Sequence, residues 1–127
     1  MHADEMTDSY GHRAATQLLA LPNPPTAFLV SSIIVANGVR RAIEGAGLRL
    51  GKDISVVIHD DDLSYFRNGD ELPSFTAVQS SVRDAGRRAA EILLELIREP
   101  EHRQIQELLE AQLVVGSSTG PAPRPAS

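Results

Sequence analysis

The sequence predicts an α/β fold with three layers, in which helices flank a parallel sheet. Residues 54–57 are apolar or small in succession and leave no polar face, which is typical of a central strand in a parallel sheet. Another apolar run at residues 26–30 lies between two helical repeats, which gives the order helix, strand, helix, strand. The short connections favour right-handed crossovers, so these elements form half of a doubly wound sheet.

The first half of the chain contains two predicted helices and two predicted strands. The helix at residues 11–21 has one apolar face and ends at a cluster of prolines. A strand follows at residues 26–30. In the next helix, residues 34–46, apolar side chains recur at helical spacing and glycines provide the end. The strand at residues 54–58 completes this half.

The second half begins with a long connection at residues 59–73, which is a candidate for binding or for an interface. A short strand is expected at residues 75–78. Next comes a strongly amphipathic helix at residues 82–97, which a serine can cap. Residues 112–115 are expected to form a last strand.

Composition restricts the class of protein. The chain has 127 residues, 42% hydrophobic and 23% charged, which is typical of one globular domain. It has no cysteine, so neither disulfides nor thiolate metal sites are expected. The net charge of −5 argues against nucleic-acid binding by this segment. No apolar run is long enough for a membrane span, and the acidic start does not match a signal peptide, so a cytoplasmic protein is expected.

Three carboxylates, Asp60, Asp61 and Asp62, follow the most buried predicted strand. Ligands bind beyond the carboxyl ends of parallel strands, so this is the predicted site. The acids could hold Mg²⁺ for phosphoryl transfer, could form a solvated loop, or could accept hydrogen bonds from a polyhydroxylated ligand. Phosphoryl transfer needs a nearby cation, and the single lysine, Lys52, lies at the opposite end of the strand. The polyhydroxylated ligand is therefore favoured.

Other motifs predict no catalysis. Residues 116–120 match G-x-S-x-G, but the acid and histidine of a triad do not follow, so they are interpreted as a turn. Residues 47–52 approach a phosphate-binding loop, but Ala46 stands where its first glycine is needed and Asp53 where a hydroxyl residue is needed, so a helix-to-strand turn is expected. The histidines lack metal-ligand spacing, and His59 is interpreted as a strand-end residue. We expect no enzymatic activity, metal or cofactor.

The order of these motifs resembles the C-terminal part of the effector-binding domain of lactose-repressor-type (LacI/GalR) transcriptional regulators. Seven pieces in the family's order carry the resemblance: Pro25-Thr-Ala-Phe-Leu-Val30, Ala36-Asn-Gly38, Gly47-Leu-Arg-Leu-Gly51, Asp53-Ile-Ser-Val-Val57 with Asp60-Asp61, Pro73-Ser-Phe-Thr-Ala-Val78, the helix with Gly86, Ala89, Ala90 and Leu93, and Leu113-Val-Val115 with Ser118-Thr119. The resemblance implies part of a type I periplasmic-binding-protein-like fold, in which two Rossmann-like lobes clamp a small molecule.

The resemblance also implies the site residues. The family's sugar-binding acid falls on Asp60, the polar residue after the preceding strand on Ser32, and the hinge-side polar contact near Ser80. We add His59 and Asp61, which flank the acid in the sequence. These five residues form the predicted ligand-binding set.

The same resemblance implies a division of the chain. Residues 1–10 are a polar lead-in, and residues 11–74 form part of the C-terminal lobe. Residues 75–119 cross a hinge near residues 75–81 and supply elements of the N-terminal lobe. Residues 120–127 are expected to be a disordered tail.

The chain departs from the family pattern at several positions. Ile58 replaces a usual glycine and is expected to narrow the space beside the ligand. Ile33 replaces a usual aspartate at the end of a strand, and Gly116 replaces a common arginine. A longer amide is common in relatives near Ser80. These differences predict a ligand that is less polar or differently placed.

The sequence therefore predicts the effector-sensing part of a bacterial regulator, with a sugar or polyol as its ligand. Two alternatives stay open, a solute-binding protein of the periplasmic type and, less favoured, an aspartate-dependent Mg²⁺ phosphotransfer enzyme. The chain contains no helix-turn-helix, so DNA would be bound through another segment. A single lobe exposes apolar surface, which predicts a homodimer with contacts from residues 34–46 and from Tyr65 and Phe66.

Overall fold

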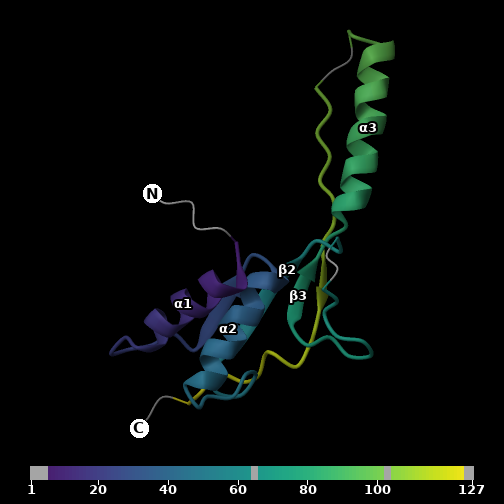
Figure 1. Ribbon diagram of the computed structural model, residues 1–127. Helices are drawn as coiled ribbons and strands as arrows, with labels where there is room; N and C mark the ends of the chain where they lie inside the picture. Colours follow the sequence, from purple (N-terminus) through teal and green to yellow (C-terminus); the bar gives the residue numbers. More distant parts are fainter. Residues whose placement is uncertain (1–5, 64–65, 102–103, 125–127) are drawn as a thin grey trace.

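The computed structural model describes residues 6–63, 66–101 and 104–124. The predicted order of elements is confirmed, with boundaries that differ by a few residues. The elements are α1 (Asp8–Leu19), β1 (Ala27–Val30), α2 (Ile33–Gly45), β2 (Ser55–Asp60), β3 (Thr76–Gln79), α3 (Val82–Arg98) and β4 (Gln112–Val114) (Figure 1).

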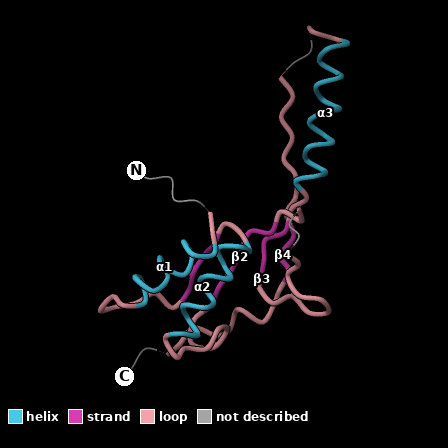
Figure 2. Tube along the Cα trace, in the orientation of Figure 1, coloured by secondary structure: helices cyan, strands magenta, loops and turns pink. Residues whose placement is uncertain are grey.

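The four strands form one sheet in the order β1-β2-β3-β4. β1, β2 and β3 are parallel, as predicted, whereas β4 is antiparallel to β3. β2 is central: Val56 pairs with Phe28 of β1, and Ile58 pairs with Ala77 of β3. The antiparallel direction of β4 follows from the path of the chain, which leaves β3 into α3 and returns beside it (Figure 2).

The core lies between the sheet and α2. Every second residue of β2, Val56 and Ile58, is fully buried on this face, as expected for strand periodicity. α1 packs on α2, so both helices cover the same face (Figure 1). On the opposite face Leu29 is 84% exposed. Of the three expected layers, the described residues thus form the sheet and one helical layer.

α1 begins earlier than the sequence predicted. The Thr7 side chain accepts a hydrogen bond from the Tyr10 backbone N–H at 3.1 Å and caps the helix, so the predicted lead-in at residues 1–10 already contains its first turn. Glycines let α1 approach α2 closely. A Cβ atom at Gly38 would clash with the backbone oxygen of Asp8, and one at Gly11 would clash with that of Val35. Backbone therefore packs directly on backbone at this crossing.

An arm projects from the sheet, made of α3 and the extended residues 104–111 (Figure 1). Ser81 caps α3 by accepting from the Asp84 N–H at 3.1 Å. No residue of α3 is fully buried, and α3 contacts none of the other helices or strands that the structure describes. Leu93, Ile97 and Leu108 are exposed, and Leu108 reaches 98%. The amphipathic pattern predicted the helix correctly, but its apolar face has nothing to cover it within the described residues.

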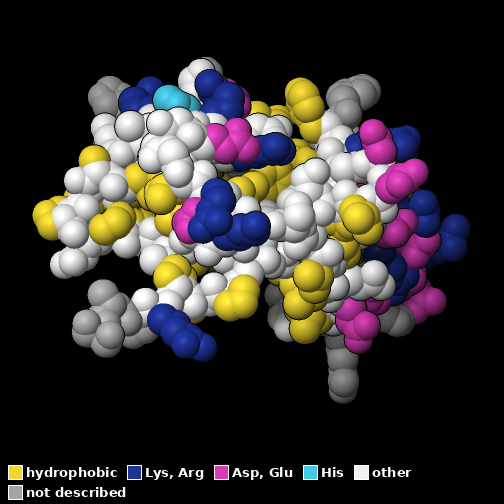
Figure 3. All heavy atoms as spheres, turned by 90° about the horizontal axis from the view of Figure 1, so that it is seen from below, with side chains coloured by type: hydrophobic (Ala, Val, Ile, Leu, Met, Phe, Trp, Pro, Cys, Tyr) yellow, Lys and Arg dark blue, Asp and Glu magenta, His cyan; other side chains and the backbone are white. Residues whose placement is uncertain are grey.

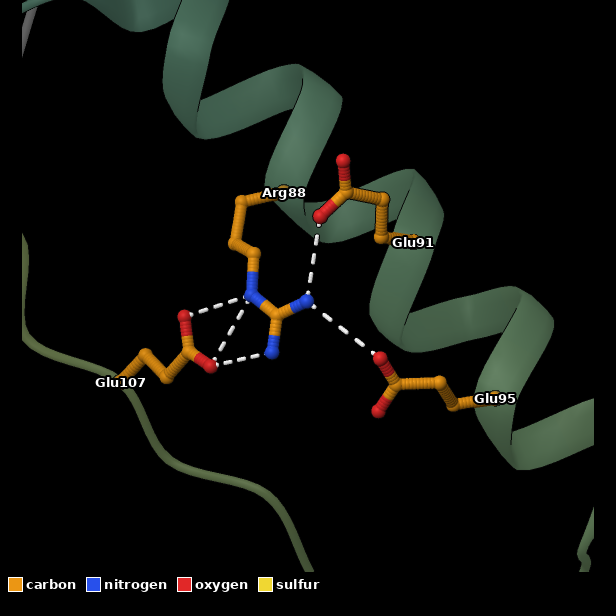
Figure 4. Close-up of polar contacts among 4 residues, drawn as sticks. All are labelled: Arg88, Glu91, Glu95 and Glu107. Atoms are coloured by element: carbon orange, nitrogen blue, oxygen red, sulfur yellow. Dashed lines mark hydrogen bonds and ion pairs between the residues drawn. The ribbon is translucent and has the colours of Figure 1, made fainter.

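A cluster of ion pairs joins α3 to the extended residues 104–111 of the arm (Figure 4). The Arg88 guanidinium donates to Glu107 at 2.8–2.9 Å from Nε, and to Glu91 and Glu95 of its own helix at 3.1 and 3.3 Å. Hydrogen bonds from Arg88 lower the pKa of the Glu107 carboxyl. This arginine–glutamate latch is the polar contact that holds residue 107 against α3.

Gly38→Ala should destabilise the fold, because the added methyl group forces α1 away from α2. We expect a loss of about 1–3 kcal/mol in the free energy of unfolding, measured by urea denaturation. Gly45→Ala is the matched control: it lies in the same helix with open space around it, and should stabilise by about 0.4–1 kcal/mol. Equal effects of the two substitutions would contradict a close contact at Gly38.

Glu107→Gln should loosen the arm, because it removes the charge that attracts Arg88. We expect larger backbone motion in residues 104–111 at neutral pH, measured as lower NMR order parameters, with no change for Glu110→Gln. The pKa of Glu107 is lower in the folded chain, so the latch is fully formed above the usual pKa of glutamate and is lost as pH falls through the lowered value. Order parameters that change with neither the substitution nor acidification would refute the latch.

Candidate functional site

A pocket of about 340 Å³ opens at the carboxyl ends of β2 and β3. Strand residues form its floor, and the loop after β2 forms its wall. Asp60 and Gln79 are the polar strand residues in it, and Val114 contributes from β4. The lining consists of Asp60, Asp62, Phe66, Arg67, Asn68, Gly69, Pro73, Ala77, Gln79 and Val114. This is the position that the sequence predicted for the ligand.

The strand register brings the floor together. Asp60 is the last residue of β2 and pairs with Gln79, the last residue of β3. The Ser80 backbone N–H donates to the Asp60 backbone oxygen at 3.0 Å and extends this pairing by one residue. Both floor residues share the face of the buried Ile58 and Ala77. The buried part of the sheet therefore carries the polar pair at its edge.

Asp60, Asp61 and Asp62 form a tight local turn. The Asp62 N–H donates to Asp60 Oδ1 at 3.0 Å, and the Leu63 N–H donates to Asp61 Oδ1 at 3.2 Å. Asp62 has φ +55°, a left-handed conformation that aspartate tolerates better than most side chains. Each bond uses one carboxylate oxygen, so Asp60 retains acceptor capacity toward the pocket.

The structure does not bring the five predicted site residues into one pocket. Asp60 lines it. His59 lies on the opposite face of the sheet, because neighbouring strand residues alternate, and its Nε2 is 3.0 Å from Ser80 Oγ. Ser32 caps α2 by accepting from the Val35 N–H at 3.3 Å. None of His59, Ser80 and Ser32 lines the 340 Å³ pocket.

Asp61 supports the root of the arm. Its side chain accepts from Leu63, and its backbone oxygen accepts from the Val82 N–H at 3.3 Å. Val82 is the first residue of α3. Asp61 thus contributes to the turn and to the hinge, and it does not line the pocket beside Asp60.

The departures from the family pattern have structural explanations. Ile58 was expected to narrow the ligand space, and this is wrong: its side chain is fully buried in the core and does not line the pocket. Ile33 is buried at the start of α2. At Gly116, a Cβ atom would lie 2.6 Å from the Pro73 oxygen, so this backbone has no room for a side chain.

The G-x-S-x-G segment is a structural turn, as predicted. Ser118 is fully buried and has two partners: its Oγ accepts from the Thr76 N–H at 2.8 Å and donates to the Val56 backbone oxygen. The Val56 N–H donates to the Ser118 oxygen at 2.9 Å. Ser118 therefore joins β2 to β3 at the end away from the pocket, and its hydroxyl has no role as a nucleophile.

The segment resembling a phosphate-binding loop is also a turn, as predicted. The Asp53 carboxylate accepts from the backbone and side chain of Arg49, both at 2.8 Å. The hydrogen bond with the Arg49 side chain lowers the pKa of Asp53 to about 2. These bonds stabilise the connection from α2 to β2.

The sequence did not identify Arg67, Asn68 and Gln79 as pocket residues. Gln79 lies one position before Ser80, where a longer amide was expected from the resemblance. The Asn68-Gly69 dipeptide is a turn signal that could have indicated a turn within the loop. No signal in the sequence placed Arg67 at the pocket, because its position depends on how the loop folds back onto Phe75.

The described residues contain no group of three or more histidine or acidic side chains arranged for a metal ion. Their helices are all too short or too polar to cross a bilayer. On the face shown in Figure 3, Lys and Arg alternate with Asp and Glu and form no broad patch of one sign among the described residues.

The sequence profile of the periplasmic binding protein-like domain family matches residues 2–119. The chain belongs to this family. The match extends over nearly the whole chain, and the relatives place it with the LacI-type regulators, which confirms the resemblance stated above.

Two relatives illustrate this. The HTH-type transcriptional regulator AglR of Rhizobium meliloti is 43% identical over 123 residues, 97% of this chain and 35% of its own length. The probable HTH-type transcriptional repressor ExuR of Bacillus subtilis is 38% identical over 109 residues, 85% of this chain and 32% of its own length. The chain thus spans about a third of these regulators and corresponds to the effector-binding portion.

Solved structures of LacI-type regulators have the same fold as this chain. A LacI family transcriptional regulator from Bifidobacterium animalis superposes with a TM-score of 0.81 at 28% identity, covering 97% of this chain and 44% of the other. The lac repressor dimer bound to operator and the anti-inducer ONPF superposes with a TM-score of 0.77 at 32% identity, covering 91% and 39%. The predicted α/β fold of the periplasmic-binding-protein type is confirmed.

Proposed function

We propose that this chain is the effector-sensing portion of a bacterial transcriptional regulator, and that its effector is a sugar or polyol. One observation carries the proposal: in a chain of this family, the Asp60 carboxylate lines a pocket of about 340 Å³ at the carboxyl end of a parallel strand. A carboxylate there accepts hydrogen bonds from hydroxyl groups and needs neither a metal nor a base.

Asp60 is the primary ligand residue of this proposal. Gln79 joins it on the floor. Ser80 and His59 stay in the proposed site as a hydrogen-bonded pair on the other side of the strand end, and Ser32 and Asp61 complete the predicted set. In this arrangement a small ligand in the pocket would contact Asp60 and Gln79, and only a ligand that extends past the strand ends would also reach His59 and Ser80.

We propose that residues 11–74 form part of one lobe, and that residues 75–119 cross the hinge and belong to a second lobe. The arm supports this division, because α3 contacts none of the described elements of the sheet and its apolar side chains, such as Leu93 and Ile97, are exposed. Burying this surface would recover roughly 25 cal/mol for each Å² of apolar area. The exposed Leu29 face of the sheet is a second surface to be covered.

In the complete regulator, effector binding would close the two lobes and shift the protein between states with different affinity for DNA. The size of the shift is set by the difference in effector affinity between the states. The lac repressor structure carries both an operator and a small molecule, which supports this role for a relative. We place the regulator in the cytoplasm, where DNA is accessible, and assign it no enzymatic activity.

Two alternatives predict different behaviour. A solute-binding protein of the periplasmic type shares the fold and would bind sugar, but its binding would not alter affinity for DNA. A phosphotransfer enzyme would use the aspartates to hold Mg²⁺. The pocket contains Arg67 and no lysine, and the described residues offer no three-ligand group for a metal.

Asp60→Asn tests the proposal. Titration calorimetry on the complete polypeptide should detect a neutral mono- or disaccharide, and the substitution should weaken its binding about tenfold or more, because the charged acceptor is lost. Asp84→Asn, on α3, should leave binding unchanged. Mg²⁺ alone should not shift the thermal midpoint; a Mg²⁺ shift that Asp60→Asn abolishes would support the phosphotransfer enzyme and refute the sensor.

We also propose that the chain dimerises through α2 and the loop after β2. Ile34 is 38% exposed on α2 and Phe66 is 58% exposed on the loop, whereas Tyr65 lies outside the described residues. Light scattering at micromolar concentration should give the mass of a dimer, and Ile34→Asp with Phe66→Asp should give a folded monomer. A monomer before substitution would refute the proposal.

A further inference from the structure

Hydrogen bonds hold the part of the pocket wall formed by residues 68–75. The Asn68 amide nitrogen donates to the Phe75 backbone oxygen at 2.7 Å, and the Phe75 N–H donates to Asn68 Oδ1 at 2.7 Å. Gly69 follows with φ +88°, in a turn where a Cβ atom would clash with the Leu72 oxygen. Asn68 and Gly69 thus hold the backbone of the preceding residue, Arg67, at the rim of the pocket.

Arg67 is a charged residue of the pocket without a partner among the described residues. The structure shows no hydrogen bond or ion pair for it, although Asp60 and Asp62 line the same pocket. By contrast, Arg40, Arg49 and Arg88 all have carboxylate partners. The guanidinium and the two carboxylates therefore border one space of about 340 Å³ that a ligand can fill.

The donors and acceptors of the pocket are divided between these groups. Carboxylates of Asp60 and Asp62 accept hydrogen bonds and so suit hydroxyl groups, which donate. A ring or glycosidic oxygen carries no hydrogen and needs a donor. One N–H of the Asn68 amide is donated to the Phe75 oxygen. Arg67 is the charged donor of the pocket, and the Gln79 amide is a neutral one.

We propose that Arg67 is a ligand-contact residue that donates to an effector oxygen lacking hydrogen, and that the effector is an uncharged glycoside or cyclic sugar. This inference rests on the proposed function. The class follows from charge: two carboxylates outnumber one guanidinium, so the pocket repels a sugar acid or a sugar phosphate more than it attracts either. Arg67 thereby determines specificity beside the acid at Asp60.

The loop also borders a second pocket, which gives Arg67 another possible role. Phe66, Arg67 and Gly69 line a space of about 450 Å³ with Asn37 and Arg40 of α2. This space adjoins the proposed dimer contact. If Arg67 served the dimer, its substitution would change the oligomeric state and leave effector binding intact.

The test is calorimetric titration of the complete polypeptide with matched probes: neutral mono- and disaccharides, their methyl glycosides, and the uronates and 6-phosphates of the same sugars. Variants are Arg67→Gln and Arg67→Lys. Arg83→Gln is the matched control, because it removes the same charge from an exposed position on α3, outside the pocket.

A neutral sugar or glycoside should bind at least tenfold more tightly than its uronate or phosphate. Arg67→Gln should weaken binding about tenfold, Arg67→Lys less, and Arg83→Gln not at all. Unchanged binding by Arg67→Gln, or tighter binding of the charged probes, overturns the inference and leaves the effector proposal standing. Binding of no probe, by any variant or the parent chain, refutes the proposed function itself.

Discussion

The parallel pairing of β2 with β1 and β3 is the constraint on which the rest of the structure depends. Val56 and Ile58 bury one face of β2 under α2, so a slip of one residue would bring His59 into the core and turn Asp60 away from the pocket. Ser118 reinforces the register from the far end, because its hydroxyl bonds to Val56 on β2 and to Thr76 on β3. The position of the Asp60 carboxylate is thus fixed by contacts along the whole strand.

The same periodicity explains which parts of the site could be predicted. The sequence predicted both the burial of β2 and the acid at its end, because a short apolar run is followed there by aspartates. His59 was grouped with Asp60 because the two are adjacent in the sequence, and strand alternation places them on opposite faces of the sheet. The sequence placed the end of this strand at residue 58, so alternation could be applied to the pair only once the structure extended β2 to Asp60.

Other features depend on contacts between distant residues and could not be read from local pattern. Arg67 reaches the pocket because Asn68 bonds to Phe75, seven residues away, and nothing in the loop composition specifies that pairing. The close crossing of α1 and α2 requires Gly11 and Gly38 to meet backbone from the other helix. For α3 the pattern was sufficient, because helical periodicity and the Ser81 cap are local even where the apolar face is uncovered.

The first residues of the arm are hydrogen-bonded to the end of β2, which carries the pocket residue Asp60. The Ser80 N–H bonds to the Asp60 backbone oxygen and the Val82 N–H bonds to that of Asp61, so the first residues of the arm are fastened to the acid pair. A change in the direction of the arm must break these two bonds or carry residues 60 and 61 with it. In the proposed site, a ligand bound to the Asp60 side chain would lie beside the backbone hydrogen bond that joins Asp60 to Ser80 at the root of the arm. Coupling between effector and lobe orientation needs only that the ligand contact Asp60 differently in the two orientations.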